Sequence, residues 1–138
     1  MNWWDDDVPW EHRAPDDRMF EERRRHFLHH GMVAEVRAWR SGELVGLEVT
    51  PRDEFMKAPP NPGIPWHISV AFNPAPHRLM AFLEAWGRPR RVHLRFSRIK
   101  DNAVATLDPR GPVANDPLIQ AMHKDDERYG GRDLHVTF

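Results

Sequence analysis

Two stretches of the chain repeat one pattern: a histidine, an apolar residue, a hydroxyl residue and a second apolar residue. They are His67-Ile68-Ser69-Val70 and His135-Val136-Thr137-Phe138. Each lies in a short run of β-branched and apolar residues, which is typical of a strand. Side chains two positions apart share one face of a strand, so each histidine aligns with its hydroxyl residue. The fold therefore has to bury the apolar faces of two strands and leave two histidine–hydroxyl pairs on the opposite faces.

These four polar side chains are suited to a phosphate group. Imidazole titrates near neutral pH, so one histidine can accept a proton while the other donates one. The hydroxyls of Ser69 and Thr137 can donate hydrogen bonds to phosphate oxygens as charge develops on them. Chance is the alternative explanation, because the chain has nine histidines, but Ser and Thr together number only six. We therefore interpret the repetition as a sign of function.

The pattern of the whole chain predicts an α+β fold in a single domain, residues 1–138. Residues 1–15 hold three tryptophans among acids and prolines, and we expect them to form an irregular arm. Acids at the start and bases at the end predict a helix over residues 16–30, and Gly31 is typical of its end. Further helices are expected over residues 73–86 and 116–124. Strands are expected over residues 32–39, 44–50, 66–72, 91–99, 103–108 and 133–138.

Composition excludes several classes of protein. The chain has no cysteine, which excludes disulfides and thiolate metal sites. No apolar run reaches the roughly 18 residues that a membrane span needs, so we expect a soluble, cytoplasmic protein without a membrane partner. The net charge of −1 argues against binding to long nucleic acid, because such proteins usually carry a basic excess. The oligomeric state is left open.

With these two motifs and this order of elements, residues 64–138 resemble the 2H phosphoesterase superfamily, which is named for two His-x-Thr/Ser motifs. The resemblance implies two pseudo-symmetric lobes of antiparallel sheet with flanking helices, and motifs that face each other across a central cleft. It also implies phosphodiesterase activity without metal or cofactor on small ribonucleotides. Carried over by motif, His67 and His135 would be the catalytic pair, while Ser69 and Thr137 would hold the phosphate.

The substrates that the resemblance implies are 2′,3′-cyclic phosphates, 2′,5′-linked oligoadenylates and cyclic oligonucleotides, the last being degraded by members from phages. The chain departs from the family in using Ser69 where Thr is commoner. It also has one residue after Thr137, where members continue with a further helix and strand. We therefore expect the N-terminal helix and the hairpin of residues 32–50 to complete the sheet beside the second motif; a chain cut short at its C-terminal end is the alternative explanation.

Two reactions fit the same residues. On an RNA-like linkage, one histidine would take the proton of the attacking 2′-hydroxyl and the other would protonate the leaving 5′-oxygen. On a cyclic phosphate, one histidine would activate water and the other would protonate the leaving sugar oxygen. The sequence leaves open which histidine is the base. A non-catalytic protein that sequesters a nucleotide in the same cleft is the rival hypothesis.

For several other residues the sequence gives weaker evidence of a functional role. Trp66 and Tyr129 adjoin the motifs and could stack on a base, although ordinary packing is the commoner role of such rings. Lys57 could reach a phosphate from its loop, although most such residues are simply solvated. His93 alternates with polar neighbours and could line the cleft, but surface exposure is the more common outcome. His26, His29 and His30 have a helical spacing that could surround a metal, yet no fourth ligand lies nearby in the sequence, so we expect no metal site.

Overall fold

The computed structural model describes residues 25–52, 63–100, 104–126, 128, 130 and 132–137. Within this part the chain is α+β, as the sequence predicts, with one mostly antiparallel, curled sheet and flanking helices. The elements are β1 (Met32–Ser41), β2 (Leu44–Pro51), β3 (His67–Phe72), α2 (Pro76–Trp86), β4 (Arg90–Leu94), β5 (Phe96–Lys100), β6 (Val104–Leu107), α3 (Pro117–Lys124) and β7 (His135–Thr137). Residues 25–30 are also helical.

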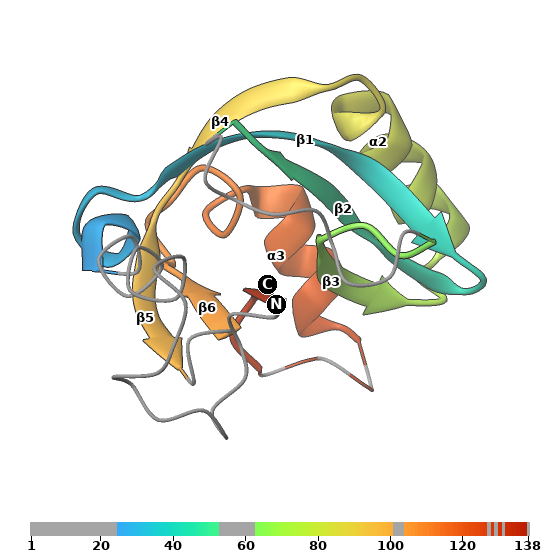
Figure 1. Ribbon diagram of the computed structural model, residues 1–138. Coiled ribbons are helices and arrows are strands. Elements are labelled where there is room, and N and C mark those ends of the chain that lie inside the picture. The colour runs from blue at the N-terminus through green and yellow to red at the C-terminus, as the bar shows by residue number, and fades with distance from the viewer. Residues whose placement is uncertain are drawn as a thin grey trace.

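The seven strands form one sheet in the order β4-β1-β2-β3-β7-β6-β5 (Figure 1). Its two edge strands, β4 and β5, are consecutive in the chain and only Arg95 lies between them. The same stretch of chain therefore forms both edges, which is possible only because the sheet curls round. The carbonyl oxygen of Arg95 accepts a hydrogen bond from Asp108 N at 2.8 Å, which fixes the bend.

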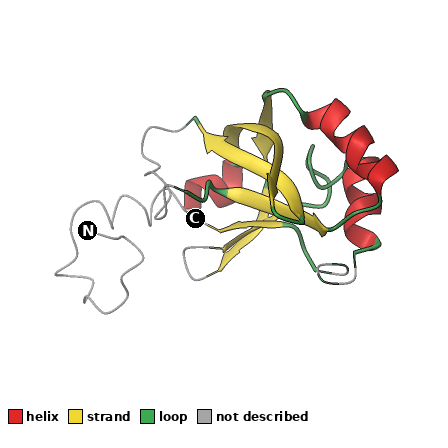
Figure 2. Cartoon of the chain, turned by 90° about the vertical axis from the view of Figure 1, so that its right-hand side faces the viewer, coloured by secondary structure: helices red, strands yellow, loops and turns green. Residues whose placement is uncertain are grey.

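Helices α2 and α3 cover one face of the sheet. They pack against each other, α2 also contacts β1, and α3 contacts β3. Figure 2 shows both helices on the same side of the sheet. The core lies between these layers, and its large, fully buried side chains include Leu47, Ile68, Val70, Phe82, Trp86, Ile119 and Val136. Burial of this apolar area is the main force that holds the helices on the sheet.

Local sequence signals explain most element ends. Gly31 ends the first helix with φ +76°, and its N–H bonds Phe27 O at 2.7 Å. Two residues, Gly42 and Glu43, connect β1 to β2, and Gly42 supplies the positive φ that such a turn favours. Asp116 caps α3 by accepting hydrogen bonds from the first backbone N–H groups of the helix.

Two predicted elements differ from the structure. The strand expected over residues 91–99 is two strands, because β4 pairs with β1 whereas β5 pairs with β6. The alternation of buried and exposed residues continues through Arg95, so the sequence gives no sign of the bend. The helix expected from residue 73 begins at Pro76 instead. Asn73 has φ 53° and its N–H bonds Glu43 O, so it forms a turn at that point.

The hairpin of β1 and β2 lies beside the first motif strand. β2 pairs with β3, whereas the second motif strand, β7, lies between β3 and β6. The expectation that the hairpin completes the sheet beside the second motif is therefore wrong. The arm of residues 1–15 and the start of the helix expected at residue 16 lie outside the described residues. In the described part of the chain, no helix is long and apolar enough to cross a membrane.

Gly46 allows β2 and β3 to approach at an irregular point in their pairing. The register shifts between Val45 and Gly46, so that Gly46 pairs with Ser69 and Val45 with Ala71. A Cβ atom on Gly46 would overlap the carbonyl oxygen of Ile68. Because that oxygen belongs to the backbone of a paired strand, it has little room to move.

We expect Gly46→Ala to lower the free energy of unfolding by about 1–3 kcal/mol, the usual cost of overpacking a close contact. Gly111→Ala is the matched control, because a Cβ there would lie 3.2 Å from Asp108 O and needs only a small adjustment. Urea denaturation followed by circular dichroism measures both variants. Equal stability of Gly46→Ala and the wild-type protein would contradict the predicted clash.

Candidate functional site

The two motifs lie on neighbouring strands. β3 and β7 are antiparallel, and Ile68 pairs with Val136. Both of these side chains are fully buried, so the residues on either side of them point to the opposite face of the sheet. The antiparallel register then sets His67 opposite Thr137, and Ser69 opposite His135. The structure thus brings together all four residues of the predicted catalytic set.

The four side chains form a block with the histidines at diagonal corners. Directly opposite residues of an antiparallel pair have Cβ atoms about 4.5–5.5 Å apart, and diagonal ones about 7–8 Å apart. Two imidazoles at this spacing can flank a single phosphate group. An antiparallel pair also has a local two-fold axis, here at the Ile68–Val136 pair. This axis exchanges His67 with His135 and one hydroxyl with the other.

The two imidazole rings are held in the same way. His67 Nδ1 lies 2.9 Å from Pro65 O, and His135 Nδ1 lies 3.2 Å from Asp133 O. Each partner is a carbonyl oxygen two residues earlier in the chain, and it can only accept a hydrogen bond. Nδ1 therefore carries the proton in each neutral ring, and the lone pair is on Nε2. This second nitrogen, the one farther from the backbone, is the ring atom that could accept a proton from a ligand or donate one to it.

The two hydroxyls are available to a ligand. Ser69 is half-buried and Thr137 is exposed. In the described ranges neither hydroxyl makes a hydrogen bond to another group of the protein. A hydroxyl can donate to a phosphate oxygen and accept from another donor at once. The block therefore offers two hydroxyl donors between two proton-transfer groups.

Two rows of residues on the side of the sheet opposite the core extend from this block; Thr106, in the first row, is itself only 5% exposed. One row passes through Ser69 and His135, and the strand pairings give its order as Trp39, Gly46, Ser69, His135, Thr106 and Arg98. The other passes through His67 and Thr137, in the order Arg37, Glu48, His67, Thr137, Val104 and Lys100. The β1–β2 flank of the block is thus aromatic and mixed in charge, and the β5 flank is basic.

Trp39 packs against one of the two histidines. Its ring centroid lies 4.4 Å from that of His67, with 30° between the ring planes. Trp39 pairs with Gly46, which has no side chain to separate the indole from β3. The indole restricts the orientation of the His67 ring and leaves this histidine less exposed than His135. The sequence prediction missed Trp39, although its place on the polar face of a strand, opposite a glycine, was a signal.

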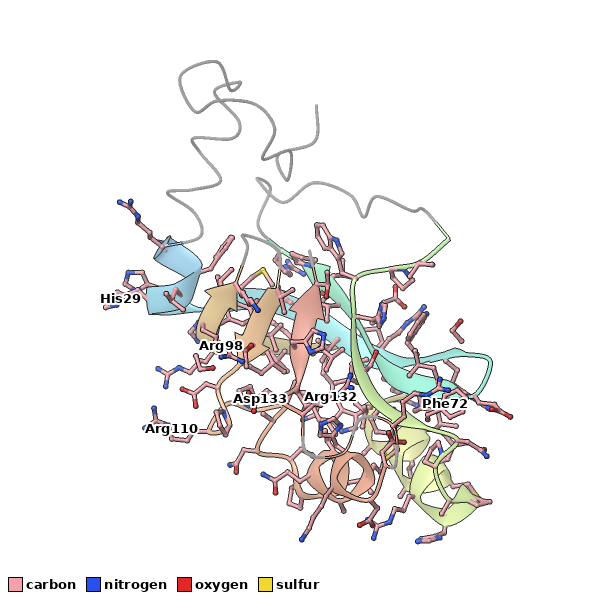
Figure 3. All side chains as sticks on the ribbon, turned by 90° about the horizontal axis from the view of Figure 1, so that it is seen from below. His29, Phe72, Arg98, Arg110, Arg132 and Asp133 are labelled. Carbon is pink, nitrogen blue, oxygen red and sulfur yellow. The ribbon has the colours of Figure 1, made fainter. Side chains whose placement is uncertain are left out.

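Arg98 lies on the other flank. Its Nε is 3.4 Å from Thr106 Oγ1, and Thr106 pairs with His135. One terminal nitrogen of the same guanidinium is 3.7 Å from a carboxylate oxygen of Asp133. Figure 3 shows Arg98 and Phe72 on opposite sides of β7, with Asp133 at the start of that strand. These contacts draw the Arg98 side chain over β6 toward the histidine.

His123 on α3 holds the two motif strands together. Its Nδ1 lies 2.8 Å from Val70 O on β3, and its Nε2 lies 2.6 Å from Arg132 O, just before β7. The doubly protonated ring can donate to both oxygens at once. β7 has three residues and pairs with β3 at Ile68 and Val136, so this bridge supports a short pairing.

Not every predicted site residue joins the block. Trp66 is 7% exposed and belongs to the core, so it cannot stack on a base, and that expectation is corrected. Lys57 and Tyr129 lie outside the described residues. His93 is exposed on β4, where its Nε2 contacts His30 O, far along the sheet from β7.

The histidines of the first helix form a separate cluster. The ring centroids of His26 and His29 lie 4.7 Å and 4.5 Å from that of His30. Loss of hydration lowers the pKa of His30, and the charges of His29 and His26 lower it further. In the described ranges, no three His, Asp or Glu side chains are arranged to hold a metal ion.

A cavity of about 710 Å³ lies at the far end of β3. Its lining includes Phe72, Arg78, Asp125, Asp126 and Arg128, but none of the four motif residues. The Arg128 guanidinium lies 4.1 Å over the Phe72 ring, and Asp126 accepts a hydrogen bond from Phe72 N at 2.6 Å. The polar residues that line this cavity therefore contribute to the packing between β3 and the helices.

Comparison with known proteins gives no match of any kind: no protein-family model matches the chain, and no curated protein or solved structure is significantly similar to it.

The hydrogen bonds at Nδ1 predict the tautomer of both motif histidines. When neutral, His67 and His135 should each carry the proton on Nδ1, which long-range ¹H–¹⁵N correlation NMR reads directly. His77 is exposed on α2 and has no hydrogen bond in the described residues, so its ring serves as the reference. A proton on Nε2 of either motif histidine would contradict the proposed orientation of that ring.

Replacing the bridging histidine should loosen β7. We expect His123→Ala to lower the free energy of unfolding by about 1–3 kcal/mol, because two carbonyl oxygens lose their donor. Hydrogen exchange at the amides of Val136 and Thr137 should accelerate more than exchange in β1. The exposed His77→Ala is the control and should leave both quantities unchanged. Uniform acceleration across the sheet would show that His123 has only a general stabilising role.

Proposed function

We propose that the protein is a metal-independent phosphodiesterase of the 2H type, which acts on a phosphodiester of a small ribonucleotide. His67 and His135 are the acid–base pair, and Ser69 and Thr137 hold the non-bridging phosphate oxygens. The observation that carries the proposal is the symmetric placement of the two imidazoles, diagonal to each other and each with Nδ1 on a carbonyl oxygen. The outward face of an antiparallel sheet is ordinarily polar, so the support comes from the repeated histidine–hydroxyl pairs and their matching ring orientation rather than from polarity alone.

The geometry suits in-line displacement at phosphorus. A phosphate centred over the Ile68–Val136 pair would have one imidazole Nε2 toward the entering oxygen and the other toward the leaving oxygen. On an RNA-like linkage, one histidine takes the proton of the 2′-hydroxyl, this oxygen attacks phosphorus, and the other histidine protonates the departing 5′-oxygen. The product is a 2′,3′-cyclic phosphate. The hydroxyls of Ser69 and Thr137 stabilise the charge on the equatorial oxygens.

A 2′,3′-cyclic phosphate reacts on the same residues. One histidine removes a proton from water, the resulting oxygen attacks phosphorus, and the other histidine protonates the sugar oxygen that leaves. The histidine that acts as base ends the reaction protonated, and the one that acts as acid ends it neutral. The two histidines have therefore exchanged protonation states. Because the local two-fold axis makes the two positions similar, either histidine can serve as the base, according to which way the substrate lies.

We further propose that the sheet has the two-lobed plan of that superfamily. One lobe is the hairpin β1-β2 with motif strand β3, and the other is the hairpin β5-β6 with motif strand β7. The order β1-β2-β3-β7-β6-β5 supports this division, since each motif strand has a hairpin on its outer side. In this interpretation the motifs meet at the junction between lobes.

The net charge of −1 favours a short substrate over long RNA. The candidate substrates are cyclic oligonucleotides, 2′,5′-oligoadenylates and nucleoside 2′,3′-cyclic phosphates. A partner of this size fits on the four-residue block and its flanks, and it needs no continuous basic surface.

The test is chromatography of these three substrate classes after incubation with the protein in EDTA. We expect the wild-type protein to convert one class, and His67→Ala and His135→Ala to reduce the rate about 10²–10⁴-fold each. His77→Ala, in which an exposed histidine outside the site is replaced, should retain the wild-type rate.

Two results would overturn the proposal. Activity that is lost in EDTA and restored by Zn²⁺ or Mn²⁺ would show that a metal ion takes part. Substrates that stay intact but bind, with binding lost in both histidine variants, would establish the rival function of a nucleotide-sequestering protein.

A further inference from the structure

We propose that Arg98, assisted by Lys100, forms a second anion site on β5, which binds a phosphate next to the one between the histidines. The inference rests on the proposed function and deepens it: the preferred substrate carries at least two phosphates. The relevant observations are the position of both cations on the outward face, the contacts of Arg98 and the difference in charge between the two flanks of the site.

Strand pairing places both cations in line with the catalytic block. Arg98 pairs with Thr106, which pairs with His135, and Lys100 pairs with Val104, which pairs with Thr137. The contact of Arg98 Nε with Thr106 shows that its guanidinium lies above β6. β6 is one and a half strand spacings, about 7 Å, from the line midway between β3 and β7. That distance separates two neighbouring phosphate groups, so one side chain reaches the second while the histidines flank the first.

The present partner of Arg98 is easily exchanged for a phosphate. Its ion pair with Asp133 is 3.7 Å long, and both side chains are 68% exposed. Exposed pairs of this kind contribute about 0–1 kcal/mol. A phosphate offers oxygens that match the fork of a guanidinium and carries a larger charge. Lys100 is exposed at the end of β5 and makes no ion pair with the described residues.

Among the described residues, the two rows differ in charge on the two sides of the block. Glu48 pairs with His67, and its carboxylate is 3.4 Å from the guanidinium of Arg37, so the rows hold one acid and one base on this flank but two bases, Arg98 and Lys100, on the other. Trp39 adds an aromatic surface there. The aromatic flank of mixed charge suits an uncharged base or sugar, whereas the basic flank suits a phosphate. The unequal flanks therefore give the substrate one direction across the block, despite the local symmetry of the motifs.

The test uses two pairs of substrates that differ by one phosphate. The first pair is adenosine 2′,3′-cyclic phosphate with and without a 5′-phosphate, and the second is a diribonucleotide and a triribonucleotide of the same bases. In the wild-type protein, the extra phosphate should raise kcat/KM about 10–100-fold in the pair that is turned over, and less at high salt. Arg98→Gln should remove most of this gain, so that its kcat/KM values on the two members of a pair become nearly equal. Lys100→Gln should reduce the gain to a lesser extent.

Arg110→Gln is the matched control, because Arg110 is an exposed arginine that pairs with Asp108 in a loop outside the rows. It should leave the gain unchanged. A gain that survives in Arg98→Gln, or equal rates for both members of a pair in the wild-type protein, would overturn the second anion site and leave the phosphodiesterase intact. A wild-type protein that converts none of the four substrates would overturn the second anion site, and inactivity on all three classes of the chromatographic test as well would overturn the proposed function.

Discussion

The antiparallel pairing of β3 with β7 is the interaction on which the candidate site depends. Its centre is the contact between Ile68 and Val136, both fully buried. Burying these two side chains fixes which face of each strand points outward, because a shift by one residue would send both histidines into the core. The same pairing sets the histidines on one diagonal and the hydroxyls on the other. The apolar residues within the motifs therefore determine the geometry of the polar ones.

This pairing is short and is supported from outside the two strands. His123 joins Val70 O to Arg132 O, and Leu107 N donates to Leu134 O at 2.8 Å where β6 meets β7. The shift of register near Gly46 leaves Val70 without a partner on β2, and its carbonyl oxygen is the one that His123 uses. The irregular pairing of β2 with β3 thus leaves a carbonyl oxygen through which His123 stabilises the pairing of β3 with β7.

The surroundings of the two motifs differ more than the motifs themselves. His67 packs on Trp39 and faces Glu48, whereas His135 faces Thr106 with Arg98 above it. The symmetric part of the site suits a reaction in which two imidazoles exchange roles. The unsymmetric part suits recognition, since it distinguishes the two ends of a bound molecule. This division explains how a site of repeated motifs selects one direction for its ligand.

The sequence by itself determined the local features: the two motif strands, the hairpin before them, the helix end at Gly31 and the short helix expected over residues 116–124. Each depends on neighbouring residues, because strand alternation, turns and caps act over a few positions of chain. For the same reason the sequence identified which side chains of each motif share a face. It did not reveal the bend at Arg95, where the alternation of buried and exposed residues is uninterrupted.

Only the tertiary structure decided which strands are neighbours. The motifs lie 68 positions apart in the chain, and their pairing depends on how the apolar faces of the entire sheet pack against α2 and α3. The same long-range order put the N-terminal hairpin beside β3 and brought Trp39 and Arg98 to the two flanks. It also placed Trp66 in the core, although this residue directly precedes the first motif. Residues far apart in sequence meet only through packing, and local sequence patterns do not predict which strands become neighbours.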